Sequence, residues 1–97
     1  MVKIIWAELA IDDLTNIGNY SSRFSDKYAS SIISKLFNKV NILKKMPKIG
    51  RVVPEKNDEN VRELIEGNYR IIYELRSDER IEVLMVHHSS RPLLGVI

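Results

Sequence analysis

Apolar residues in the first half of the chain recur at helical spacing in two successive runs. The first run steps by three or four residues, with one wider gap, and predicts a helix over residues 8–23. A second helix follows Ser25, which suits the N-cap position, and two lysines and then Pro47 end it. Because little separates the two runs, they predict an antiparallel helical hairpin. The apolar positions are Ala7, Ala10, Leu14, Ile17 and Phe24, then Ala29, Ile32, Ile33, Leu36, Val40 and Leu43.

Segments rich in β-branched and aromatic residues on either side of this hairpin predict strands. Val2–Trp6 precedes the hairpin, whereas Val61–Ile65, Tyr69–Leu75 and Ile81–His88 follow it. Turn sequences of hairpin length separate the last three strands, so they should form an antiparallel meander. Residues 46–60, which hold two prolines, one glycine and a polar cluster, predict a loop.

The order of these elements predicts an α+β fold, β-α-α-β-β-β, with one antiparallel sheet and the helical hairpin on one face. Ninety-seven residues suffice for one domain, residues 1–97, with an apolar C-terminal tail at 91–97. On the middle strand of the meander, alternation assigns four apolar residues to the helix side and three residues to the open face. The helix-side residues are Tyr69, Ile71, Tyr73 and Leu75, and the open-face residues are Arg70, Ile72 and Glu74.

The same alternation along the last strand predicts which residues share a surface. It places Met85 in the helix-facing core, and it places His88 beside Arg70 on a half-exposed open face. The predicted core is therefore Trp6, Leu14, Ile17, Ile32, Leu36, Val40, Tyr69, Ile71, Tyr73, Val83 and Met85.

Composition and charge narrow the class of protein. A hydrophobic fraction of 44% with 29% charged residues is ordinary for a folded domain. The chain has no apolar run long enough to span a membrane and no signal-peptide pattern, which favours a cytoplasmic protein. The absence of cysteine excludes disulfides and Cys-based zinc sites, and we expect no cofactor or metal. The stretch 44–56 holds five basic residues and one acid. Such a stretch could bind phosphates or an acidic partner, or it could form a solvated rim.

Three segments together resemble one known family, the RelE/ParE superfamily of toxins from type II toxin–antitoxin systems. They are the strand pair VRELIEGNYRIIYEL (Val61–Leu75), the strand ending VHHSSR (Val86–Arg91) and the PKIGR turn (Pro47–Arg51). The resemblance implies a growth-arresting toxin that a cognate antitoxin neutralises in a hetero-oligomer. RelE-like members cut mRNA on the ribosome, whereas ParE-like members poison DNA gyrase. A degenerate member that binds antitoxin without toxicity is a third alternative.

The candidate functional residues follow from the resemblance to the RelE-like nucleases. Arg70 matches the arginine that holds the phosphate in those enzymes, unless it forms an ion pair across the sheet with Glu63, Glu74 or Glu82. His88 could act as acid or base or could simply order the strand end. Arg91 could hold a phosphate or an antitoxin carboxylate. Arg51 and Glu55 lie in the loop where some nucleases supply a base.

Two departures from the RelE-like pattern bear on the target. Val61 and Glu63 stand where well-studied RelE-like enzymes have lysines. Those enzymes also have a tyrosine near the C-terminus, whereas no aromatic residue follows Tyr73 in this chain. The long helical hairpin and the HSSR ending resemble the ParE-like members of the superfamily more closely. The sequence therefore leaves two targets open, ribosome-bound mRNA and DNA gyrase.

Overall fold

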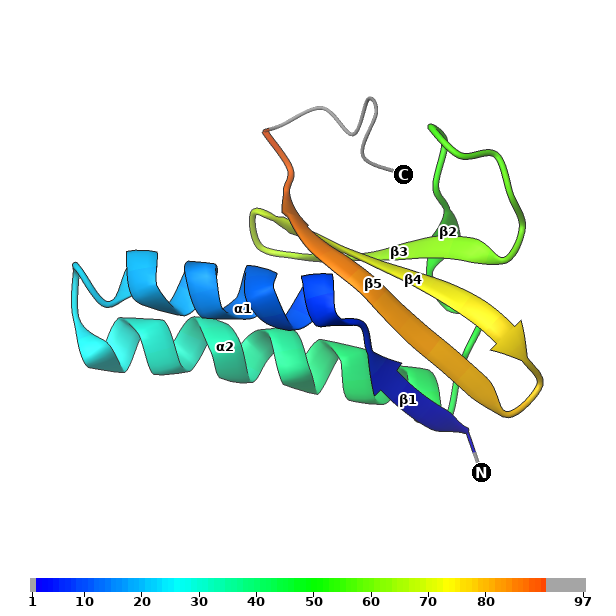
Figure 1. Ribbon diagram of the computed structural model, residues 1–97, viewed down its shortest axis with the longest axis horizontal. Helices are drawn as coiled ribbons and strands as arrows, with labels where there is room; N and C mark the ends of the chain where they lie inside the picture. Colours follow the sequence, from blue (N-terminus) through cyan, green and yellow to red (C-terminus); the bar gives the residue numbers. More distant parts are fainter. Residues whose placement is uncertain (1, 91–97) are drawn as a thin grey trace.

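A helical hairpin lies across one face of a five-stranded sheet, which confirms the predicted α+β class (Figure 1). This architecture comes from a computed structural model that describes residues 2–90. The elements in chain order are β1 (Lys3–Trp6), α1 (Glu8–Ser21), α2 (Asp26–Asn41), the 3-10 turn η1 (Ile42–Lys44), β2 (Arg51–Val52), β3 (Val61–Glu66), β4 (Tyr69–Ser77) and β5 (Arg80–His88). The predicted order of helices and strands is thus confirmed, and the predicted tail at 91–97 lies outside the described residues.

The strands stand in the order β1-β5-β4-β3-β2. The meander β3-β4-β5 is antiparallel, as its short turns predict. The sheet as a whole is mixed and not antiparallel throughout as predicted, because β1 runs parallel to β5. The helical hairpin supplies the long crossover connection that a parallel neighbour requires. β2 is a two-residue strand inside the segment predicted to be a loop, and it pairs antiparallel with β3.

The turn between the helices is set by Ser25, as the sequence predicts. The Ser25 hydroxyl accepts the backbone N–H of Tyr28 at 2.9 Å, which caps α2. The first helix ends at Ser21, two residues earlier than expected. Phe24, counted in the apolar stripe of that helix, therefore lies in the turn and is exposed.

The main core fills the space between the hairpin and the sheet. Leu36, Ile71, Tyr73 and Val83 have no exposed surface, and Trp6, Ile17 and Ile32 pack partly buried around them. The expected helix-facing set is confirmed with one exception, Met85 in β5. The buried members of this core are Ala10, Leu14, Leu36, Val40, Leu43, Leu64, Ile71, Tyr73, Ile81, Val83 and Val86.

A β-bulge in β5 explains that exception. Ile72 pairs with Met85 and Tyr73 pairs with Val83, so Leu84 is an extra residue without a partner on β4. Beyond the bulge every side chain of β5 changes face relative to simple alternation. Met85 therefore packs away from the helices, and the prediction that it joins the helix-facing core is wrong.

Candidate functional site

The face of the sheet away from the helices is covered by the segment between η1 and β3. Val53, which follows β2, packs with Val61, Ile72 and Met85 in a second, smaller core. This cover changes the surroundings of Arg70. The predicted face is correct, but the residue is only 9% exposed, so the prediction of a half-exposed surface is wrong.

The Arg70 guanidinium lies between two carboxylates. Its Nη1 and Nη2 atoms donate to the two oxygens of Glu55, at 2.9 and 3.0 Å, in a bidentate pair. Its Nε atom donates to Oε1 of Glu63 at 2.5 Å. The Glu63 side chain is completely buried, whereas Glu55 keeps about a third of its side-chain surface exposed, at 32%. The alternative in which Arg70 forms an ion pair with Glu63 is therefore the geometry observed.

Arg51 completes this group of charges. Its guanidinium contacts the second oxygen of Glu63 from the solvent side, and 65% of its side-chain surface is exposed. We call Arg51, Glu55, Glu63 and Arg70 the charge cluster. Two arginines and two glutamates give the charge cluster a formal charge of zero.

The pKa values show how strongly Arg70 and Glu55 are coupled. The hydrogen bonds from Arg70 lower the pKa of Glu55 from 4.5 to about 2. The hydrogen bond to Glu55 is also the largest cause that raises the pKa of Arg70, against the opposing effect of burial. Both groups are therefore charged at neutral pH, and each compensates the charge of the other.

The PKIGR turn holds Arg51 at this position. The Tyr73 hydroxyl accepts the Gly50 N–H at 3.0 Å and donates to the Pro47 carbonyl at 2.9 Å. Arg62 Nη1 donates to the Gly50 carbonyl at 3.0 Å. A Cβ atom at residue 50 would lie 2.6 Å from both the Tyr73 hydroxyl and the Glu63 carbonyl oxygen, so the close approach requires glycine.

His88 lies on the other face of the sheet. Because of the bulge, His88 pairs with Tyr69 and its ring contacts the Tyr69 ring edge-on at 5.4 Å, while His87 lies opposite Arg70. The predicted pairing of His88 with Arg70 is therefore wrong. Nδ1 of His88 lies 2.6 Å from the Ser90 hydroxyl and accepts the Ser90 N–H at 3.2 Å. This local bonding matches the alternative in which the histidine orders the strand end.

Three of the five candidate residues thus come together in the charge cluster, and His88 stands apart from them. Arg91 lies outside the described residues. Glu63 is the member that sequence reasoning did not select as a site residue. The available signal was an acid on the strand beside Arg70, within an otherwise apolar stretch.

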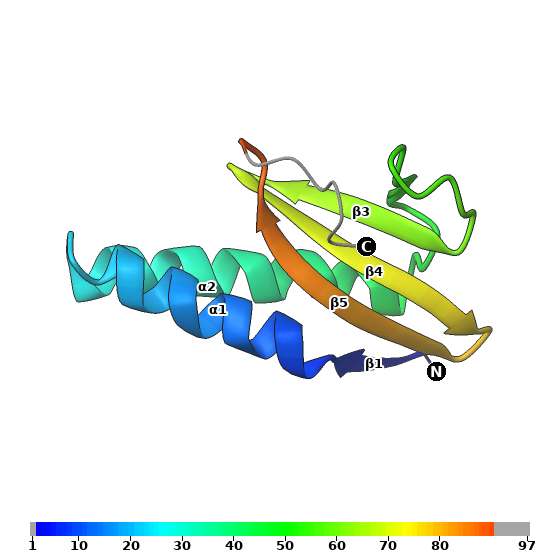
Figure 2. The same ribbon diagram turned by 45° about the horizontal axis from the view of Figure 1, so that its top comes forward.

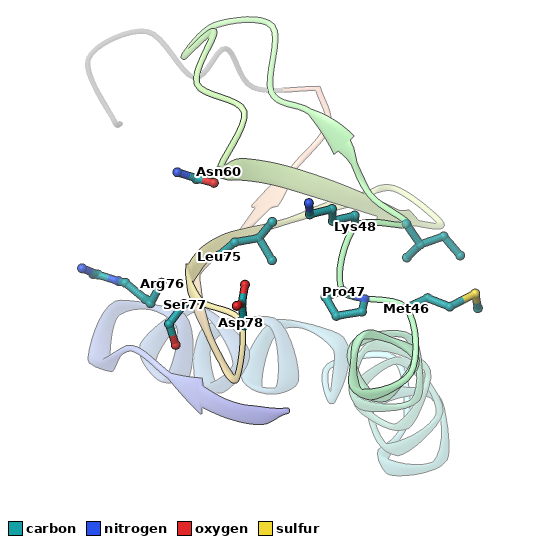
Figure 3. A pocket seen from close by; sticks show the side chains of 9 residues that line it. Met46, Pro47, Lys48, Asn60, Leu75, Arg76, Ser77 and Asp78 are labelled. Atoms are coloured by element: carbon teal, nitrogen blue, oxygen red, sulfur yellow. The ribbon is translucent and has the colours of Figure 1, made fainter. Parts of the chain in front are cut away.

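A pocket of about 640 Å³ opens elsewhere, between the segment after η1 and the β4–β5 turn (Figure 3). Met46, Pro47 and Leu75 give it an apolar lining, and Lys48 and Asp78 bring opposite charges to its wall. None of the four predicted site residues that the structure describes lines this pocket.

Within residues 2–90, no three histidine or acidic side chains come together in a way that could hold a metal ion. None of the helices found there is both long and apolar enough to cross a membrane.

Comparisons with known proteins agree with this architecture. Residues 4–93 match the family described as the ParE toxin of the type II toxin–antitoxin system parDE. The chain belongs to the ParE toxin family. The solved structure "Chromosomal ParDE TA system from P. aeruginosa" has the same fold, with a TM-score of 0.76 over 91% of this chain and 96% of that one. The two sequences are 19% identical. No curated protein sequence matches the chain.

Proposed function

We propose that this ParE-family toxin arrests growth by binding DNA gyrase and that it does not cut mRNA. The observation that carries the proposal is the arrangement around Arg70, whose guanidinium already donates to Glu55 and Glu63. DNA gyrase works in the cytoplasm, which is where the proposal places the toxin.

The chemistry of RNA cleavage argues against a nuclease at the charge cluster. Attack by a 2′-hydroxyl needs a base, an acid and an excess of positive charge around one phosphate. A phosphate reaching Arg70 would have to displace Glu55 and would then lie near the buried carboxylate of Glu63. The charge cluster has no net charge to offset that repulsion. His88, the candidate acid or base, is on the opposite face of the sheet.

Neutralisation by a cognate antitoxin, in a hetero-oligomer, is the second part of the proposal. Lys44, Lys45 and Lys48 are all exposed beside the apolar residues Met46 and Ile49, which are each 50% exposed. A disordered acidic segment that folds on binding could cover both the charges and the apolar surface. We expect the antitoxin to be a small acidic protein encoded beside the toxin.

The experiment is induced expression of the toxin in a bacterial host, with mRNA cleavage and DNA double-strand breaks measured in the same cultures. The expected result is growth arrest with DNA breaks and intact mRNA, relieved by co-expression of the neighbouring antitoxin. Growth arrest with cleaved mRNA and intact DNA would overturn the gyrase target. Normal growth under full expression of the folded protein would indicate a degenerate member.

A further inference from the structure

Three exposed aromatic rings lie around the turn between α1 and α2, two of them at the helix ends and one in the turn itself. Tyr20 is 57% exposed, Phe24 is 68% exposed and Tyr28 is 50% exposed. The Phe24 ring contacts both tyrosines edge-on, with centroids 5.9 Å from Tyr20 and 5.8 Å from Tyr28. The Arg23 guanidinium lies 5.7 Å from the centre of the Tyr20 ring. We call Tyr20, Arg23, Phe24 and Tyr28 the aromatic tip.

The α1–α2 turn, around which the aromatic tip lies, projects from the molecule. Both views of the ribbon show the α1–α2 turn extending well past the nearest edge of the sheet (Figures 1 and 2). The backbone there is fixed, because the Ser22 N–H binds the Gly18 carbonyl at 2.9 Å and Ser25 caps α2. The rings therefore extend from an ordered backbone and contact one another, which lowers the entropic cost of association.

The rings contribute little to the stability of the fold, and their exposure to water is energetically unfavourable. Neither Phe24 nor Tyr20 belongs to either core cluster of the described residues. A contiguous group of exposed aromatic side chains is typical of an interaction site. Tyrosine and arginine are also the residue types enriched among those that dominate binding energy at protein interfaces.

We propose that the aromatic tip inserts into a preformed apolar pocket with an acidic rim on the toxin's protein target. This inference rests on the proposed function and names the surface that contacts the target. A projecting, rigid tip requires a concave receptor on a folded protein, whereas a flexible antitoxin segment needs a groove to fold into. Arg23 and Lys27 beside the rings favour acidic residues around the pocket.

The ring geometry favours a protein over a single-stranded nucleic acid. Bases stack on open aromatic faces that stand in a positively charged groove. At the aromatic tip the rings pack edge to face against each other, so that they form one compact apolar body.

Phe24→Ala tests the proposal, with Ile11→Ala as the matched control. Both residues are exposed, at 68% and 51%, and Ile11 lies on α1 outside the aromatic tip. Each full-length variant is assayed for growth arrest, affinity for purified DNA gyrase, co-purification with the antitoxin and thermal unfolding. We expect Phe24→Ala to bind gyrase at least about tenfold more weakly and to lose growth arrest. Its thermal midpoint and antitoxin binding should match those of the wild type and of Ile11→Ala.

The outcomes separate this inference from the proposed function. Undiminished growth arrest by Phe24→Ala overturns the inference, whatever the target is. Loss of antitoxin binding with retained gyrase binding also overturns it, because the aromatic tip would then bind the antitoxin. Phe24-dependent binding to single-stranded DNA or to anionic lipid vesicles would overturn the proposal that the aromatic tip binds a pocket on a protein. If the wild type arrests growth without binding gyrase, the gyrase target fails, and the growth assay alone decides the role of the aromatic tip.

Discussion

The main effect of replacing Arg70 by methionine should be a loss of folding stability and not a loss of contacts with a target. Methionine is unbranched and about as long as the aliphatic part of arginine, and it removes the charge. The substitution leaves the Glu63 carboxylate, which has no exposed surface, with Arg51 as its remaining partner. Removing one member of a buried ion pair costs about 3–5 kcal/mol, because the other charge stays buried without compensation. Since Arg51 remains, we expect a loss of about 3 kcal/mol.

The matched control is Arg76→Met. Arg76 also contacts two glutamates, Glu74 and Glu82, but half of its side-chain surface is exposed. An ion pair screened by solvent contributes up to about 1 kcal/mol, so this variant should stay close to the wild type. The contrast isolates the effect of burial from the effect of removing an arginine.

The assay is urea and thermal unfolding of the single variants and of the double variant Arg70→Met/Glu63→Met. A loss of about 3 kcal/mol corresponds to a fall of roughly 12–24 °C in the melting temperature of a domain this small. The double variant buries no unpaired charge, so it should recover most of the loss, with a coupling of at least about 2 kcal/mol. An Arg70→Met protein as stable as Arg76→Met would refute the structural role. If that protein were also non-toxic, Arg70 would be a functional residue.

Three further predictions concern the core, the PKIGR turn and the pH dependence. Leu36→Ala should lower the free energy of unfolding by about 2–5 kcal/mol, because the side chain is fully buried, and denaturant unfolding measures this. Tyr73→Phe should cost about 1–3 kcal/mol, because the Gly50 N–H and the Pro47 carbonyl lose their shared partner, and a change within error would contradict that account. The pKa of Glu55 is about 2 in the fold against 4.5 usually, so its stabilising effect is present above pH 4.5 and is lost as the pH falls towards 2. The thermal midpoint of Glu55→Gln should therefore lie below that of the wild type at pH 7, and the two should converge near pH 2.

The fold was predictable because its signals are local. The apolar spacing from Ala29 to Leu43 predicts a helix, and the Ser25 hydroxyl caps it as expected. The short turns of the meander predict antiparallel pairing, which the structure has. The parallel placement of β1 beside β5 is a long-range contact, and the short sequence Val2–Trp6 carries no information about its direction.

The candidate site was less predictable because two of its determinants are not local. Alternation gives the right face for each residue only in a regular strand, and Leu84 breaks the regularity of β5 without a glycine or proline to mark it. The burial of Arg70 depends on the segment that carries Val53 and Glu55, which looks like an ordinary polar loop in the sequence. The three candidates around Arg70 were found, but their charge balance depends on Glu63.

The most direct test of the gyrase target uses purified components. The toxin is added to DNA gyrase with relaxed plasmid and ATP, and in parallel to ribosomes translating a defined mRNA. We expect inhibited supercoiling or trapped DNA cleavage in the first reaction and intact mRNA in the second. The antitoxin should abolish the effect on gyrase. Normal supercoiling together with cleavage of the ribosome-bound mRNA would contradict the gyrase target.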